Sequence, residues 1–128
     1  MKGVILAAGD GRRLLPATLQ TSKVLLDVGG QPLIHYAVEA LADAGVSDTV
    51  VVVGYQGQAV SAALGPVFPD LGFIQNDDYL GGNALSIYAA RDFVSDEPFL
   101  VCMGDHPIGF ETIRQLLSTG GNGNTLCV

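Results

Sequence analysis

Two cations follow a glycine-rich turn near the N-terminus of the sequence. Gly9 and Gly11 flank a single residue, and Arg13 and Lys23 come shortly after them. Because glycine has no Cβ, such a backbone turns tightly and can present N–H groups to phosphate oxygens. The two cations would add positive charge. The pattern therefore indicates a phosphorylated ligand, and the alternative is a strand that ends in a turn beside solvated arginines.

The spacing in this turn excludes two common phosphate-binding loops. A Walker A loop needs GxxxxGK[ST], which the segment lacks. A dinucleotide-binding fingerprint needs a third glycine at the position that Leu14 occupies. Neither of these two familiar loops accounts for the segment.

A carboxylate stands at the end of an apolar run much later in the chain. Asp105 follows residues 99–103 and Gly104. Mg²⁺ takes oxygen ligands and typically uses one or two carboxylates together with the phosphates of a substrate. Asp105 is the candidate metal ligand, with Mg²⁺ as the expected cofactor. The alternative is a turn aspartate that bonds its own backbone.

The elements that must position these residues follow from alternating apolar runs and helical patterns. Each apolar run ends in glycine or asparagine and is apolar on both faces, as strands of a buried parallel sheet are. This alternation predicts βαβ units and an α/β fold with an open, mostly parallel, Rossmann-like sheet and helices on both faces. The predicted strands are 3–8, 49–53, 71–75 and 99–103, and the predicted helices are 32–45, 58–64, 84–93 and 110–117.

The candidate residues fall at the carboxyl ends of the predicted strands. Ligands of open α/β sheets bind at that edge. The strand ends are Ala8 with Gly9, Gly54, Asn76, and Gly104 with Asp105. We therefore expect the glycine-rich turn, the polar segment after Asn76 and Asp105 to converge there.

The longer pattern around the turn resembles a known family. Gly-x-Gly-x-Arg-Leu-x-Pro-x-Thr, followed by Lys-Val-Leu-Leu-Asp-Val-Gly-Gly-Gln-Pro-Leu-Ile, resembles the signature of the nucleotide-diphospho-sugar transferase superfamily, specifically its sugar-phosphate nucleotidyltransferases. The resemblance implies transfer of a nucleoside monophosphate from an NTP to a phosphorylated sugar or polyol, with release of pyrophosphate. It assigns catalytic roles to Arg13 and Lys23. It assigns nucleotide binding to Leu6, Ala7, Ala8, Gly9, Gly11, Asn76, Gly82, Asn83 and Ser86.

Two shorter segments bear on the base. The spacing Gly82-Asn83-x-x-Ser86 resembles the segment with which the family reads the nucleobase and ribose, although Asn83 could instead be a helix N-cap. Gly104-Asp-His106 resembles the version found in inositol-1-phosphate cytidylyltransferases, which favours CTP. The role of His106 stays open between acceptor contact and packing. The family usually has Pro-Lys where this chain has Ser22-Lys23, and small Ser or Thr where it has Arg12, which we expect to be exposed.

Composition limits the partners. Six Lys and Arg against thirteen Asp and Glu leave no basic stripe for a nucleic acid polymer. Cys102 and Cys127 are too few for a disulfide framework, which favours a reducing, cytoplasmic location. The apolar run before Gly9 is too short for a signal peptide or for membrane insertion. A homo-oligomer stays open.

The family's catalytic domain is normally much longer than this chain. Residues 125–128 look like the start of a fifth strand, so we expect 1–128 to be the nucleotide-binding part of a larger nucleotidyltransferase domain. The acceptor half would then be absent, and the activity of this chain alone is open. The alternatives are a molybdopterin guanylyltransferase-like enzyme that prefers GTP, a catalytically silent NTP-binding module, and an assembly protein that recruits partners through a sheet edge.

Overall fold

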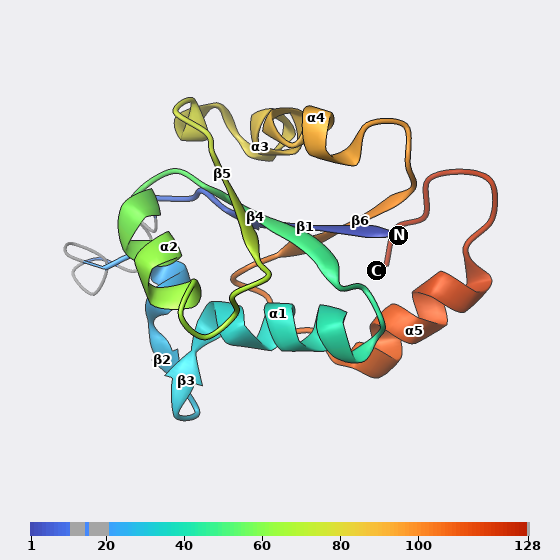
Figure 1. The fold of residues 1–128 in the computed structure, drawn as a ribbon, viewed down its shortest axis with the longest axis horizontal. Coiled ribbons are helices and arrows are strands. Elements are labelled where there is room, and N and C mark those ends of the chain that lie inside the picture. Colours follow the sequence, from blue (N-terminus) through green and yellow to red (C-terminus); the bar gives the residue numbers. More distant parts are fainter. Residues whose placement is uncertain (11–14, 16–20, 128) are drawn as a thin grey trace.

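Four parallel strands form the centre of the computed structural model, which describes residues 1–10, 15 and 21–127 (Figure 1). They stand in the order β5-β4-β1-β6, and every neighbouring pair is parallel. All four predicted strands are confirmed, and so is the α/β fold. Their bounds are Lys2–Ala7 for β1, Asp48–Val53 for β4, Gly72–Gln75 for β5 and Phe99–Met103 for β6.

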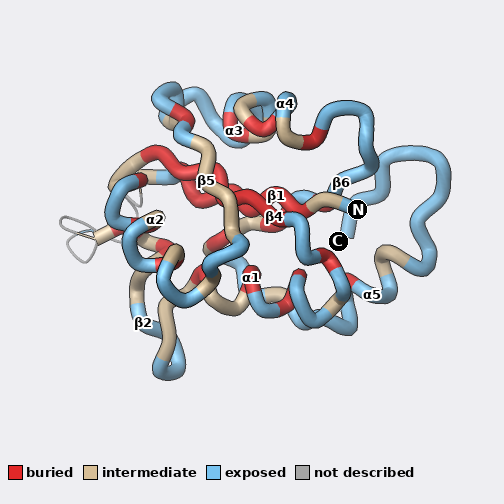
Figure 2. The backbone as a smooth tube through the Cα atoms, in the orientation of Figure 1, coloured by how far each residue is buried: buried red, intermediate tan, exposed pale blue. Residues whose placement is uncertain are grey.

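Helices cover both faces of the sheet, as the alternating pattern predicts (Figure 1). Helices α1 (Leu33–Asp43), α2 (Gly57–Leu64) and α5 (Phe110–Thr119) lie on one face. Helices α3 (Asn83–Ala89) and α4 (Arg91–Val94) lie on the other. The central strands are the most continuously buried part of the chain (Figure 2).

Strand β1 divides the core because its side chains alternate between the two faces. Ile5 packs with the cluster that contains α1, whereas Val4 and Leu6 pack with residues of α3 and α4. In register, Val4 stands opposite Val50 of β4 and Val101 of β6. The strand that ends in the glycine-rich turn is therefore fixed from both edges and both faces.

The predicted helix over 84–93 is two helices in the structure. The chain leaves helical geometry at Ala90, with φ −87° and ψ 3°, where the N–H bonds the carbonyl of Ile87 three residues back. Ala90 is buried against the sheet, and Val94 of α4 packs in the same cluster. The break lets the two short helices both lay apolar side chains on one sheet face.

A small hairpin between the first turn and α1 was not predicted. Strands β2 (Asp27–Val28) and β3 (Gln31–Pro32) pair antiparallel around Gly29 and Gly30, whose φ angles are 65° and 94°. A two-residue turn with positive φ at both positions favours glycine. The Tyr36 hydroxyl donates to the Val28 carbonyl at 2.5 Å, so the hairpin is held to α1. The described residues also form two short 3-10 turns, η2 (Lys23–Leu25) and η3 (Tyr79–Gly81).

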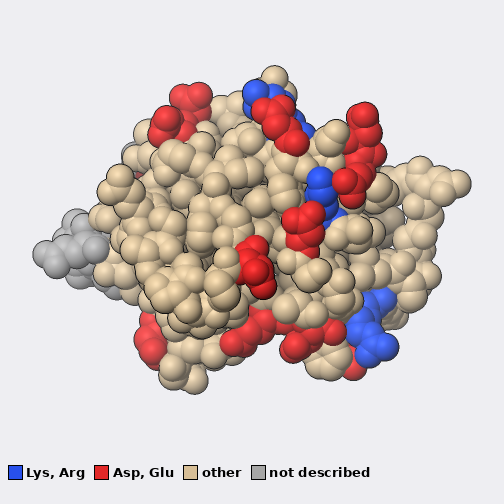
Figure 3. Space-filling view, viewed as in Figure 1, with Lys and Arg blue, Asp and Glu red and all other residues tan. Residues whose placement is uncertain are grey.

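The fifth strand expected at 125–128 is not formed by the residues that the structure describes there. Residues 125–127 are exposed and pair with no neighbouring strand, so their backbone lacks the partner that a strand requires. Among the described residues, no helix has both the length and the apolar character needed to cross a membrane. Acidic side chains are scattered over the face drawn in Figure 3, with few basic ones between them.

Candidate functional site

Backbone hydrogen bonds join the carboxyl ends of the four strands. The Gly104 N–H donates to the Leu6 carbonyl at 2.9 Å, and the Tyr55 N–H donates to the Ala8 carbonyl at 3.4 Å. On the far side, the Asn76 N–H donates to the Val53 carbonyl at 2.7 Å. The ends of β1, β4, β5 and β6, where the candidate segments begin, therefore lie together at one edge of the sheet.

The first candidate segment enters the site from β1. Leu6, Ala7 and Ala8 are buried, so their side chains belong to the core, and what they can offer a ligand is backbone. Gly9 is the first exposed residue after the strand. Gly11 and Arg13, to which the sequence assigned phosphate contacts, lie outside the described residues, as does Arg12.

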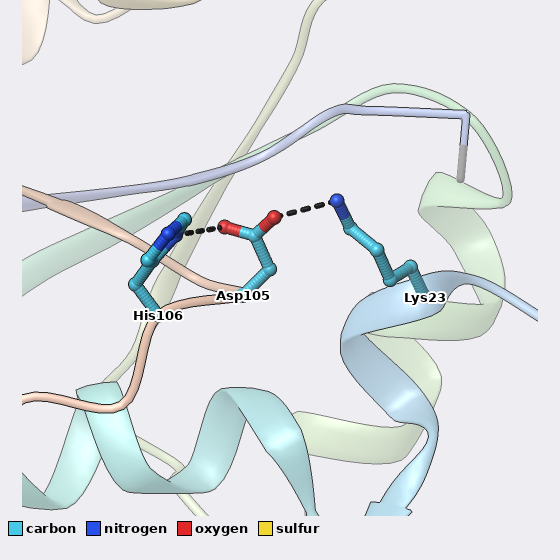
Figure 4. A network of polar contacts seen from close by, with 3 residues as sticks. All are labelled: Lys23, Asp105 and His106. Atoms are coloured by element: carbon cyan, nitrogen blue, oxygen red, sulfur yellow. Dashed lines mark hydrogen bonds and ion pairs between the residues drawn. The ribbon is translucent and has the colours of Figure 1, made fainter. Parts of the chain in front are cut away.

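Lys23, Asp105 and His106 form a polar network at this edge (Figure 4). The Lys23 ammonium, at the start of η2, lies 2.5 Å from Oδ2 of Asp105, which follows β6. Nδ1 of His106 lies 2.9 Å from Oδ1 of the same carboxylate. Sequence reasoning placed Lys23 and Asp105 in one site, and the structure brings them into direct contact.

The charge state of Asp105 follows from its surroundings. Burial by itself would raise the pKa of this carboxyl, but hydrogen bonds from Lys23 and His106, together with their charges, outweigh burial and lower the pKa below its ordinary value. Asp105 is therefore ionised at neutral pH and can only accept hydrogen bonds. Nδ1 of His106 must then carry the donated hydrogen.

A single carboxylate fits a particular kind of metal site. Within the described ranges, no group of three or more His, Cys, Asp or Glu side chains is placed to hold a metal ion. Mg²⁺ differs from zinc because it keeps waters and substrate phosphates as ligands and needs few protein ligands. The ionised Asp105, with a fifth of its side chain exposed, has the donor chemistry for such a site.

Asn76 and Ser86 are buried and bonded to each other. The Asn76 amide donates to the Ser86 hydroxyl at 3.0 Å, and its oxygen accepts from the Asp78 N–H at 3.0 Å. These bonds tie the end of β5 to α3 and fix the loop between them. Because both side chains are almost fully enclosed, the geometry favours a positioning role, and their assignment to direct nucleotide contact stays a prediction.

Gly82 and Asn83 lie exposed at the start of α3. The alternative that Asn83 caps the helix is wrong by one residue, because Gly82 occupies the cap with φ 93° and ψ 178°. Asn83 is the first helical residue, and no side-chain hydrogen bond caps this helix. Its amide therefore stays available to a ligand.

Sequence reasoning missed how Tyr79 joins two loops. A Cβ at Gly54 would lie 2.5 Å from the Cβ of Tyr79 and 2.9 Å from the carbonyl oxygen of Ala8. Gly54 thus lets the loop after β5 pack directly on the ends of β1 and β4. The sequence predicted Gly54 as a strand end, but nothing there indicated that Tyr79 would pack against it.

Comparison with known proteins identifies the family. Residues 3–128 match the model of the MobA-like NTP transferase domain. The chain belongs to this family of nucleotidyltransferases. Among curated proteins, it is 38% identical over 113 residues to a 2-aminoethylphosphonate cytidylyltransferase of Lancefieldella rimae, an alignment that covers 88% of the chain and 46% of the relative.

Two further relatives agree on the family and differ in the substrates that their names state. A glucose-1-phosphate thymidylyltransferase of Streptomyces antibioticus is 33% identical over 109 residues, covering 83% of this chain and 30% of that protein. The solved inositol-1-phosphate CTP transferase from T. maritima superposes with a TM-score of 0.80 at 25% identity, covering 96% of this chain and 49% of the other. The chain therefore spans half or less of the length of these relatives.

Proposed function

We propose that this chain is the nucleotide-binding part of an enzyme that transfers a nucleoside monophosphate from an NTP to a sugar or polyol phosphate. CTP is the favoured donor, and pyrophosphate is the product that leaves. The observation that carries the proposal is the contact of Lys23 with Asp105 beside the end of β1, in a chain of this family. A cation and an ionised carboxylate at this edge of the sheet support the binding of a triphosphate there.

The reaction needs positioning and charge neutralisation and no protein nucleophile. An oxygen of the acceptor phosphate attacks the α-phosphorus in line, and the bond from that phosphorus to the bridging oxygen breaks. Lys23 stabilises the charge that develops on the α-phosphate oxygens. Arg13 and the backbone N–H groups of the first loop hold the β- and γ-phosphates. Mg²⁺ bound by Asp105 and the phosphates would supply further neutralisation.

The preference for CTP rests on two kinds of support. The sequence from Gly104 to His106 resembles the inositol-phosphate type, and two of the three relatives named above carry cytidylyl or CTP in their names. The exposed amide of Asn83, which offers a donor and an acceptor, is the group proposed to read the base. A reducing, cytoplasmic location is proposed alongside, in keeping with two free cysteines.

A panel of nucleotides tests the function. Thermal unfolding of the chain is measured with CTP, UTP, dTTP, ATP or GTP in the presence of Mg²⁺. A ligand that binds only the folded state raises the unfolding temperature according to its affinity. CTP should give the largest shift. The strongest shift with GTP would favour the guanylyltransferase alternative, and no shift with any nucleotide would refute the proposal.

The role of Lys23 has its own measurement. Turnover is measured as pyrophosphate release from CTP and a phosphorylated acceptor, in this chain or in a longer protein that contains it. Lys23→Ala should slow this turnover by about 10²–10³, the usual loss when one charge-stabilising group is removed. Arg114→Ala is the matched control, because Arg114 is an exposed cation on α5, a helix that extends away from the site edge (Figure 1). More than half of wild-type turnover in Lys23→Ala would contradict the assignment.

A further inference from the structure

Both oxygens of the Asp105 carboxylate already have partners. Oδ2 faces the Lys23 ammonium at 2.5 Å, and Oδ1 faces Nδ1 of His106 at 2.9 Å (Figure 4). The contact to Lys23 is the shorter of the two, and it joins full opposite charges. Asp105 is therefore neutralised by a residue of the protein itself.

The proposed function gives Lys23 and Asp105 separate roles that conflict with their ion pair. Asp105 would bind Mg²⁺, whose ligand oxygens lie about 2.0–2.1 Å away. Lys23 would contact the α-phosphate. A divalent cation and an ammonium group at one carboxylate oxygen repel each other strongly at this separation. The two cations cannot share Oδ2 without a large cost.

We propose that Lys23 is the internal counter-cation of Asp105 and is exchanged for the metal when the metal–nucleotide complex enters. Lys23 leaves Oδ2 of Asp105 and moves to the phosphate, and the metal takes its place at the carboxylate. This inference rests on the proposed function. It adds to that function a coupling between metal binding and nucleotide binding. The nucleotide phosphate gives the Lys23 ammonium a new partner, and the departure of Lys23 frees Oδ2 of Asp105 for the metal.

The backbone around Lys23 suits a movement confined to its side chain. The Leu25 N–H donates to the Ser22 carbonyl at 2.9 Å, and the Leu26 N–H donates to the Lys23 carbonyl at 3.2 Å. These bonds close the turn of η2. The lysine stem has four rotatable bonds, and 28% of the side chain is exposed. The ammonium can therefore change partners while η2 stays in place.

His106 limits the exchange to one oxygen. Its ring is largely exposed, but Nδ1 holds Oδ1 and so fixes the plane of the carboxylate. Oδ2 then stays directed at the place where Lys23 and the metal alternate.

Free metal has to displace an internal cation, so it binds weakly by itself. Nucleotide offers Lys23 a new anionic partner, so metal and nucleotide strengthen each other's binding reciprocally.

The test measures metal affinity without any turnover. Mn²⁺ serves as the probe, and its free concentration is followed by electron paramagnetic resonance in the absence of nucleotide. Lys23→Met and Lys23→Gln should both bind Mn²⁺ roughly tenfold more tightly than the wild type, because the competing cation is gone. Asp105→Asn should lose this binding. Arg114→Met, which removes one exposed positive charge on α5, should leave it unchanged.

A second arm adds CTP to the same samples. In the wild type, CTP should raise the Mn²⁺ affinity, and the increase should be smaller in both Lys23 variants. Unchanged Mn²⁺ affinity in the nucleotide-free Lys23 variants would overturn the exchange. So would a gain of nucleotide-free Mn²⁺ affinity in Arg114→Met as large as the gain in the Lys23 variants. Failure of wild-type chain to bind any nucleotide would instead refute the proposed function. Thermal unfolding of each variant verifies that it is folded. If Lys23→Met does not fold, the result with Lys23→Gln decides.

Discussion

Ser22 shows how a single residue can depart from what its position favours. It is fully buried beside Lys23, and among the described residues its hydroxyl has no hydrogen-bond partner. A buried polar group without a partner costs about 1–3 kcal/mol. Its backbone angles, φ −60° and ψ 139°, are those of proline. Proline is also the residue expected here from the family signature that this segment resembles.

Ser22→Pro should therefore stabilise the chain by about 1 kcal/mol, through removal of the unpaired hydroxyl and restriction of the unfolded chain. No hydrogen bond from the Ser22 N–H to another described residue would be lost. Urea denaturation measures the change. Ser22→Ala is the control, since it removes the hydroxyl without fixing φ, and it should give only part of the gain. A lower denaturation midpoint for Ser22→Pro than for Ser22→Ala would show that the ring does not fit.

At the scale of elements, Gly54 is the point where three loops meet. Gly54→Ala would push a methyl group into Tyr79 and the Ala8 carbonyl, at 2.5 and 2.9 Å. We expect the ends of β1 and β4 to separate from η3, with a loss of CTP affinity larger than the loss of stability. Equilibrium CTP binding and urea denaturation measure the two effects.

Gly109 provides the control for that substitution. A Cβ there would contact none of the described residues within 4 Å, so Gly109→Ala should leave CTP binding unchanged. If Gly54→Ala binds CTP as the wild type does, the packing of the three loops is not what positions the nucleotide. If both variants lose binding equally, the effect is not specific to the junction.

The sequence predicted the four strands because each is a continuous apolar run that ends at glycine or asparagine. It did not predict the hairpin of β2 and β3, since strands of two residues show no periodicity, although Gly29-Gly30 is a turn signal. The break at Ala90 has no glycine or proline to mark it. The topology predicted that the glycine-rich turn and Asp105 would lie at one edge, and the family resemblance added Lys23 to the site. The direct ion pair depends on side-chain directions that spacing does not determine.

At the scale of the whole molecule, the accessibility of the two cysteine thiols indicates how completely the helices cover the sheet. Cys102 of β6 packs in the core cluster that contains residues of α1 and α5, and burial raises the pKa of its thiol to about 11. Cys127 is exposed. The thiolate is the reactive form, so Cys102 is protected both by its protonation and by its cover.

A disulfide reagent in mildly alkaline buffer should therefore modify Cys127 rapidly in the native chain and Cys102 only on unfolding. Cys127→Ser is the control, and it should show no rapid reaction until denaturant is added. Rapid reaction of the native Cys127→Ser variant would mean that the helical layer over β6 opens readily. Reaction rates with and without denaturant give the measurement.

The pairing of β1 with both β4 and β6 has a consequence for synthesis of the chain. Lys2 stands opposite Asp48 on one side and Phe99 on the other. During translation, one edge of β1 therefore stays unpaired until β6 has left the ribosome, by which point most of the described chain has been synthesised. Loop closure over such separations is slow and leaves an apolar strand exposed meanwhile. Because Asp105 lies two residues beyond β6, its network with Lys23 can form only after β6 has been synthesised.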